Sequence, residues 1–165
     1  MKKLLLISFL FLSACGFSSL YQEVTTEEKS VPVWVEPIPN QYGFTMRQII
    51  QNKFRNPKDS KYILTVSAPT FTSWDQTIDN KNFATLMGTS GTVKYRLTEK
   101  STKKVLLVSS DSLSTSYSVV QDPYATTTAQ KKASQELVER LADQVSLRVL
   151  AALAGVHNEG KTISN

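Results

Sequence analysis

The residue whose type and position most clearly indicate a chemical modification is Cys15, the only cysteine in the chain. It follows a start that carries two lysines and then a nearly continuous apolar run over residues 4–12. Ser13 and Ala14 are the small residues that a signal peptidase needs just before its cleavage site. The apolar run is too short to span a hydrocarbon core about 30 Å thick. We therefore predict that residues 1–14 are a signal peptide that is removed on export.

The tetrapeptide Leu12-Ser13-Ala14-Cys15 resembles the lipobox of bacterial lipoproteins. This resemblance implies that the thiol receives a diacylglycerol group through a thioether. Cleavage after residue 14 would then free the α-amino group of Cys15, which would receive an N-acyl chain such as palmitate. A buried core thiol is the alternative, but an exported chain with one cysteine cannot form an internal disulfide, which favours lipidation. Two or more chains anchor stably, because each buried methylene contributes about 0.8 kcal/mol. By resemblance to lipoprotein sorting rules, Gly16 in place of an aspartate favours the periplasmic face of the outer membrane.

No other residues form a constellation that could do covalent chemistry. His157 is the only histidine, and it lies in the predicted C-terminal tail. The spacings of zinc proteases, redox dithiols, nucleophile elbows and P-loops do not occur. Asp75 and Asp79 share a polar loop, where carboxylates are usually solvated, and the glycines at 88–91 do not open a helix. We therefore expect neither an enzyme nor a cofactor or metal, apart from the covalent lipid on Cys15.

The net charge of +5 falls to +3 once the signal peptide is removed, because 17 basic residues then oppose 14 acidic ones. This mild excess permits an anionic partner, and it is far from the strongly basic signature of nucleic-acid-binding proteins. Five cations gather around a predicted hairpin: Lys94, Arg96, Lys100, Lys103 and Lys104. One interpretation is a solvated face whose charges protect an exposed turn from aggregation. The other is a patch that contacts an anionic lipid head group or a partner protein.

The predicted signal peptide leaves 151 residues, which is the size of one domain with a single core. Residues 15–30 are mostly polar and are predicted to be a lipidated tether. Residues 31–155 are predicted to form one domain, and residues 156–165 a flexible tail.

Hydrophobic periodicity places the elements in the first half of the domain. Residues 31–38 alternate as a strand, and the prolines at 32 and 37 predict that this strand lies at a sheet edge. Thr45 is a candidate cap for a helix that runs to about Arg55 with one apolar stripe. Residues 62–66 alternate as a second strand, which we expect to extend past Pro69 to residues 71–74.

In the second half, residues 83–99 alternate as a strand in which Gly88 and Gly91 suggest a bulge or a bend. A polar turn over residues 99–104 leads to a further strand from 105 to about 117. Residues 126–153 give the strongest helical pattern in the chain, and Gly155 stands where a C′ residue belongs.

The expected order is therefore β-α-β-β-β-α. Helices with one apolar face must cover one face of a sheet, which predicts an α+β fold of two layers. Two helices would pack on one face of a four-stranded mixed sheet. The first two strands would connect by a right-handed crossover if they are parallel, and the last three strands would form an antiparallel meander.

The mature start, Cys15-Gly16-Phe17 followed by Leu20-Tyr21, resembles the CGFxPLY start of the lipopolysaccharide-assembly lipoprotein family LptE, especially its alphaproteobacterial branch. The resemblance continues in VWVEPIPNQYGFTMRQIIQNKF, in YRLTEKSTKKVLLVSSDSLSTSYSVVQDPYAT and in the alanine-rich final helix, over nearly the whole mature chain. The chain departs from the pattern at residues 18–19, where two serines replace the usual arginine and proline. It also lacks a strongly basic tip before the third strand.

The resemblance implies a two-layer plug seated in the outer-membrane β-barrel LptD, with lipopolysaccharide as a second partner and no covalent chemistry. Outer-membrane lipid would be contacted through the anchor, and no nucleic acid would be bound. The five cations at 94–104 would be the candidate contacts to lipopolysaccharide or to the barrel. Two alternatives remain open: an auxiliary lipoprotein of an ABC-type lipid transport system, and a lipoprotein activator of cell-wall synthesis.

Overall fold

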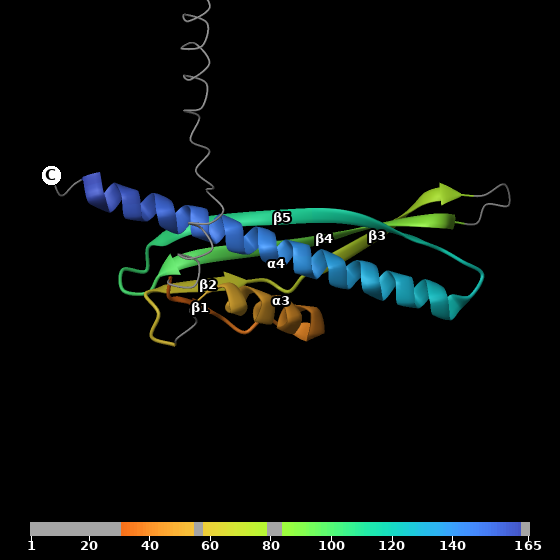
Figure 1. Ribbon diagram of the computed structural model, residues 1–165, viewed down its shortest axis with the longest axis horizontal. Coiled ribbons are helices and arrows are strands. Elements are labelled where there is room, and N and C mark those ends of the chain that lie inside the picture. Colours follow the sequence, from red (N-terminus) through yellow and green to blue (C-terminus); the bar gives the residue numbers. More distant parts are fainter. Residues whose placement is uncertain (1–30, 55–57, 79–83, 163–165) are drawn as a thin grey trace, which may run out of the picture.

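The computed structural model describes residues 31–54, 58–78 and 84–162. The predicted signal peptide, Cys15, the tether and the last three residues of the predicted tail lie outside this part. The elements follow the order β1 (Val33–Val35), α3 (Asn40–Lys53), β2 (Tyr62–Val66), β3 (Thr70–Ile78), β4 (Ala84–Glu99), β5 (Val105–Ser118) and α4 (Pro123–Thr162) (Figure 1). In these residues, two helices and a mixed sheet confirm the predicted α+β fold, with five strands in place of four.

The 16-residue strand β4 is the centre of the sheet. It pairs antiparallel with β5 along most of its length, from Leu86 to Thr98. On its other side, β3 pairs with residues 84–92 and β2 with residues 95–99, so β2 and β3 follow one another along the same edge of β4. The short strand β1 pairs in parallel with β2 and forms a sheet edge, as its two flanking prolines predicted.

The extra strand arises because the predicted second strand is interrupted at residues 67–69. Pro69 has no N–H group to donate to the ladder. Ser67 maintains the contact with β4 across the interruption: its N–H donates to the Lys94 carbonyl at 2.8 Å, and its hydroxyl accepts from the Lys94 N–H at 3.0 Å. Residues 62–74 therefore follow the edge of β4 as the single predicted strand would, but they form two strands, β2 and β3.

Both helices begin before their predicted starts; α3 ends at Lys53, slightly before the predicted end at about Arg55, whereas α4 continues past its predicted end. Helix α3 begins at Asn40, whose side-chain oxygen accepts from the Gly43 N–H at 2.8 Å as a capping residue does. Thr45, the predicted cap, lies inside the helix and bonds to the Gln41 carbonyl. Helix α4 begins at Pro123 and continues past Gly155 to Thr162, so Gly155 does not end it and the predicted tail is helical as far as Thr162. At 1.5 Å per residue, its 40 residues extend over about 60 Å.

The core lies between one face of the sheet and the two helices. Val93, Tyr95 and Leu97 point from β4 toward the helices and are buried, while Lys94 and Arg96 between them are exposed on the opposite face. This alternation matches the prediction for the strand. Helix α4 packs on β4 and β5 and against α3, and it lies along the long axis of the molecule (Figure 1). The helical side of this core is formed by Met46, Ile50, Leu137, Val138, Leu141, Val145 and Val149, all fully buried.

A buried carboxylate ties α4 to the sheet. The Asp111 side chain on β5 is only 3% exposed and pairs with the Arg148 Nε of α4 at 3.0 Å. The Tyr95 hydroxyl donates to its other oxygen at 2.7 Å. Burial raises the pKa of Tyr95, which keeps the phenol protonated and able to donate. This polar contact fixes one position of the helix on the mostly apolar inner face of the sheet.

The bulge predicted at the two glycines of β4 is wrong, because the pairing runs without a shift through both of them. Each glycine instead permits a close approach. A Cβ atom on Gly88 would lie 2.3 Å from the ring of Trp74, and one on Gly91 would lie 3.2 Å from Leu141 and from Phe71. The register shifts of the sheet lie elsewhere, at residues 75–78 of β3 and after Leu97 of β4.

Candidate binding surfaces

The sheet face that points away from the helices, which we call the open face, is rich in hydroxyl groups. Every second residue in the second half of β5 is an exposed serine: Ser110, Ser112, Ser114, Ser116 and Ser118. Because strand side chains alternate between faces, all five lie on the open face. Hydroxyls of neighbouring strands join them, as in the 3.0 Å bond between Thr92 and Ser112. The open face therefore offers many donors and acceptors with few charges.

Two cations lie on the open face in the second half of β4, beside the end of β2. Lys94 and Arg96 line a shallow groove of about 480 Å³, together with the hydroxyls of Thr65, Ser67 and Ser110. Val108, which is 64% exposed, supplies an apolar surface in the same groove. Among the described residues that line it none is acidic, although the Thr65 hydroxyl donates to the nearby Glu36 carboxylate at 2.7 Å. Cations beside an apolar surface suit a ligand that carries phosphate groups on a hydrocarbon body.

A second group of cations lies at one end of the sheet, where the turn between β4 and β5 meets the start of β2. We call this group the lysine end; it consists of Lys58, Lys61, Lys100, Lys103 and Lys104. The backbone joins the two segments, since the Lys100 N–H donates to the Lys61 carbonyl at 2.8 Å. The Lys100 ammonium also donates to the Lys58 carbonyl, at 3.4 Å.

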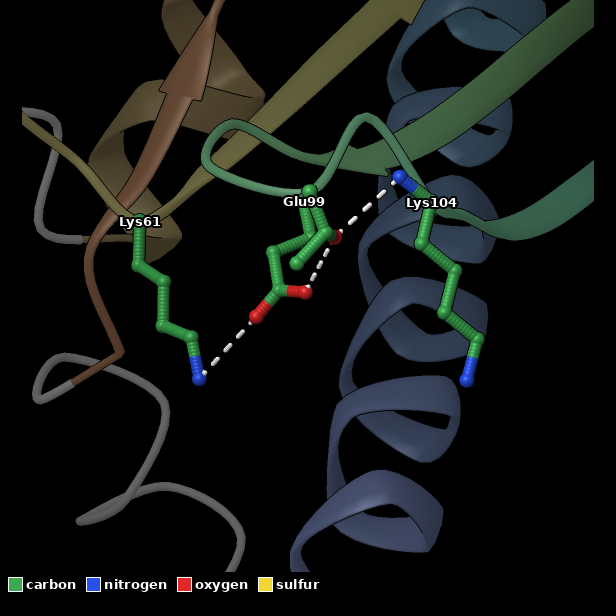
Figure 2. Close-up of polar contacts among 4 residues, drawn as sticks. Lys61, Glu99 and Lys104 are labelled. Atoms are coloured by element: carbon green, nitrogen blue, oxygen red, sulfur yellow. Dashed lines mark hydrogen bonds and ion pairs between the residues drawn. The ribbon is translucent and has the colours of Figure 1, made fainter.

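Glu99 organises the turn at the lysine end (Figure 2). Its carboxylate pairs with the Lys61 ammonium at 3.2 Å and accepts from the Thr102 hydroxyl at 2.5 Å. Its N–H donates to the Lys104 carbonyl at 2.9 Å, which closes the turn. The Lys104 side chain extends away from the carboxylate, as Figure 2 shows. The turn is thus held by one acidic residue, while most of its lysines point to solvent.

These contacts shift two pKa values in the directions that favour the charged forms. The Thr102 hydrogen bond, followed by the Lys61 hydrogen bond, holds the pKa of the Glu99 carboxyl below its usual range. The hydrogen bond to Glu99, with a further contribution from Tyr62, raises the pKa of Lys61. Both groups are therefore charged near neutral pH.

The structure separates the five cations that the sequence grouped around one hairpin. Lys94 and Arg96 lie in the groove of the open face, whereas Lys100, Lys103 and Lys104 lie in the turn. Sequence reasoning missed Lys58 and Lys61, because only the folded sheet brings the residues before β2 beside this turn. Cys15, the predicted lipidation site, lies outside the described residues.

None of the helices in the described part of the chain has both the length and the apolar character needed to cross a membrane. Among the described residues, no three His, Cys, Asp or Glu side chains come together as candidate metal ligands.

Solved structures share the fold at low sequence identity. Rare lipoprotein B from Shewanella oneidensis has a TM-score of 0.60 and 11% identity, covering 78% of this chain and 98% of that one. A Caulobacter crescentus CB15 protein described as a lipoprotein has a TM-score of 0.58 and 16% identity, covering 81% and 98%. Lipoprotein B from Nitrosomonas europaea has a TM-score of 0.55 and 14% identity, covering 76% and 88%. At these identities the likeness concerns the fold.

No curated protein matches the chain by sequence. The family model of lipopolysaccharide assembly, LptE, matches residues 31–153, which is most of the chain and the whole of the sheet. The match begins just before β1 and ends within α4. The chain therefore belongs to the LptE family of lipopolysaccharide-assembly proteins.

Proposed function

We propose that this protein is an outer-membrane lipoprotein that acts as the plug and assembly partner of the β-barrel LptD in lipopolysaccharide transport. Family membership over residues 31–153 is the observation that carries the proposal. In this proposal, residues 1–14 are the signal peptide, and diacylglycerol and an N-acyl chain on Cys15 anchor the domain to the periplasmic face of the outer membrane. Nucleic acid plays no part.

The open face is the surface that we assign to the barrel. The interior of a transmembrane barrel is polar, and its partner surface must offer hydrogen bonds without a large excess of charge. The serines of β5 and the threonines of β3 and β4 meet that requirement. Neither helix covers them, since both pack on the other face.

The groove with Lys94 and Arg96 is the site that we assign to lipopolysaccharide. A guanidinium binds a phosphate group through two parallel hydrogen bonds, and the neighbouring ammonium adds a second charge. The exposed Val108 can contact an acyl chain. The protein would bind and position this lipid without covalent chemistry, and it would need no cofactor other than its own lipid anchor.

The first experiment is co-purification of the tagged, lipidated protein from envelope membranes, combined with its depletion. We expect LptD in the eluate and less lipopolysaccharide at the cell surface after depletion. Recovery of an ABC-type lipid transporter or of cell-wall synthases, with normal surface lipopolysaccharide, would overturn the proposal in favour of one of the two alternatives.

The open face can be tested by adding bulk to it. Replacing two exposed residues of β5, Ser112→Trp and Ser114→Trp, should abolish LptD recovery. The two indole side chains would keep the open face from reaching the barrel wall. The matched control places the same bulk on the exposed side of α4, with Gln135→Trp and Glu139→Trp. Circular dichroism would establish that both variants fold. Equal LptD recovery by the two folded variants would reject the open face as the contact.

The groove can be tested by charge reversal. The variant Lys94→Glu with Arg96→Glu should lower lipopolysaccharide affinity at low salt by at least about tenfold, because close charge pairs contribute on the order of 1 kcal/mol each. The control reverses two neighbouring exposed charges on α4, with Lys131→Glu and Lys132→Glu. An equal loss in both variants would mean that only net charge matters and that the groove is not the site.

A further inference from the structure

The positive charge of this protein is concentrated at the lysine end. Residues 58–61 and 99–104 contain five lysines against Asp59 and Glu99, a net charge of +3 in ten residues. The chain from Cys15 onward also has a net charge of +3. The formal charges of all other residues of the predicted mature protein therefore cancel, because twelve cations oppose twelve anions. The domain has one charged end and is otherwise neutral.

The chain enters the domain at this same end. Val33 of β1 pairs in register with Tyr62 of β2, and the two strands run parallel. Pro32, which precedes β1, therefore lies beside Lys61, which precedes β2. Only fifteen residues, 16–30, separate the predicted lipidation site from Val31. Even fully extended, they span at most about 55 Å. The lysine end is thus the part of the domain that is joined most directly to Cys15.

The lysines are available for an external anion. Lys61 is the member of the group that has a carboxylate partner, Glu99. Lys58, Lys103 and Lys104 have exposed side chains, and no ion pair joins them to another described residue. The backbone bonds of the turn and the Glu99–Thr102 contact hold Lys103 and Lys104 on a closed hairpin, and the Lys58 carbonyl accepts from the Lys100 ammonium of the same turn. Five ammonium groups against the carboxylates of Asp59 and Glu99 leave a net positive surface, which is complementary to a surface of phosphate groups.

We propose that the lysine end is a membrane-facing surface, which rests on the phosphate groups of anionic phospholipids in the leaflet that holds the lipid of Cys15. Each lysine beside a membrane anchor adds to the electrostatic attraction to an anionic leaflet. This attraction decays within about one Debye length of the surface. The contact sets the orientation of the domain: the lysine end lies at the phosphate groups of the leaflet, and the long axis of β4 and α4 carries the open face into the barrel of the proposed function. The lipid anchor itself is taken from the proposed function.

The test uses the full lipidated protein in vesicles of phosphatidylethanolamine with or without phosphatidylglycerol. Because Cys15 is the only native cysteine and carries the lipid, Ser101→Cys supplies a single free thiol at the lysine end. A fluorophore on this thiol reports contact through quenching by a lipid with a nitroxide on its head group. The control is the same fluorophore on Ser118→Cys, which lies at the other end of β5, about 45 Å away at 3.4 Å per residue.

We expect quenching at position 101 in vesicles that contain phosphatidylglycerol and its loss at about 1 M salt, where the Debye length is about 3 Å. Position 118 should remain unquenched. Replacing Lys103→Glu and Lys104→Glu should reduce the signal at 101 to that at 118. The same charge change on α4, with Lys131→Glu and Lys132→Glu, should leave it intact.

Three results would overturn the inference: equal quenching at 101 and 118, quenching at 101 in vesicles without anionic lipid, or quenching only when lipopolysaccharide is added. Sedimentation of the protein with the vesicles tests the lipid anchor separately. A protein that sediments and binds LptD but shows no quenching at 101 would refute the membrane-facing surface and leave the proposed function standing. A protein that does not sediment would refute the anchor.

Discussion

At the scale of single residues, Glu99 is the acidic group on which the turn between β4 and β5 depends. Its carboxylate is 18% exposed and contacts one hydroxyl and one ammonium group. Since its pKa is lower in the folded than in the unfolded protein, ionised Glu99 stabilises the fold. That stabilisation is complete above the unfolded pKa of about 4.3 and is lost as the pH falls through the folded pKa.

We expect a carboxyl-carbon NMR titration of Glu99 to show a midpoint below that of an unstructured glutamate. The variant Thr102→Val should raise this midpoint, because the Thr102 hydroxyl makes the largest contribution to the shift. Lys61→Met should raise it by less. A midpoint that does not respond to Thr102→Val would contradict the assigned cause.

The buried carboxylate of Asp111 gives a second prediction at this scale. Asp111→Ala should lower the free energy of unfolding by about 1–3 kcal/mol, because the Tyr95 hydroxyl loses its acceptor and Arg148 its partner. The control is Arg140→Ala, which removes an exposed pair with Glu136 and should cost less than about 0.5 kcal/mol. Denaturant unfolding measures both, and equal costs would show that Asp111 does not tie α4 to the sheet.

At the scale of elements, periodicity located the strands and helices because their apolar faces are buried in one core. The alternation of Val93, Tyr95 and Leu97 and the four-residue spacing of Leu137, Leu141 and Val145 both correspond to fully or nearly fully buried side chains. The ends of the helices were less predictable. Asn40 caps α3 from a positive φ of 64°, and Gly155 sits inside α4 with open space around it. A cap or a break depends on local backbone geometry, which residue type alone does not determine.

Two helical glycines should respond in opposite ways to the same substitution. A Cβ on Gly43 of α3 would lie 2.6 Å from the Ile38 side chain and 3.0 Å from its backbone, so Gly43→Ala should destabilise the fold by about 1–3 kcal/mol. A Cβ on Gly155 of α4 meets nothing within 4 Å, so Gly155→Ala should stabilise it by about 0.5–1 kcal/mol. Thermal unfolding of both variants checks the signs; stabilisation by Gly43→Ala would refute the close contact.

At the scale of the whole molecule, the two layers and the uncovered sheet face followed from the pattern of apolar stripes, whereas the candidate sites did not. The sequence placed five cations near one hairpin. The fold divides them between the open face and the lysine end, and it adds Lys58 and Lys61 from a segment about forty residues earlier. Such groupings depend on long-range strand pairing, which a one-dimensional pattern does not contain.

The shared strand β4 also has a consequence for how the chain folds. Its hairpin with β5 is local, since a short turn joins the two strands, whereas β1 must find β2 across a helix. Loop-closure entropy favours local contacts, so the β4–β5 hairpin should form first and template the other strands. We expect native-state hydrogen exchange to show the slowest amides in the middle of β4 and faster ones in β1. Slower exchange in β1 than in β4 would reverse this order of assembly.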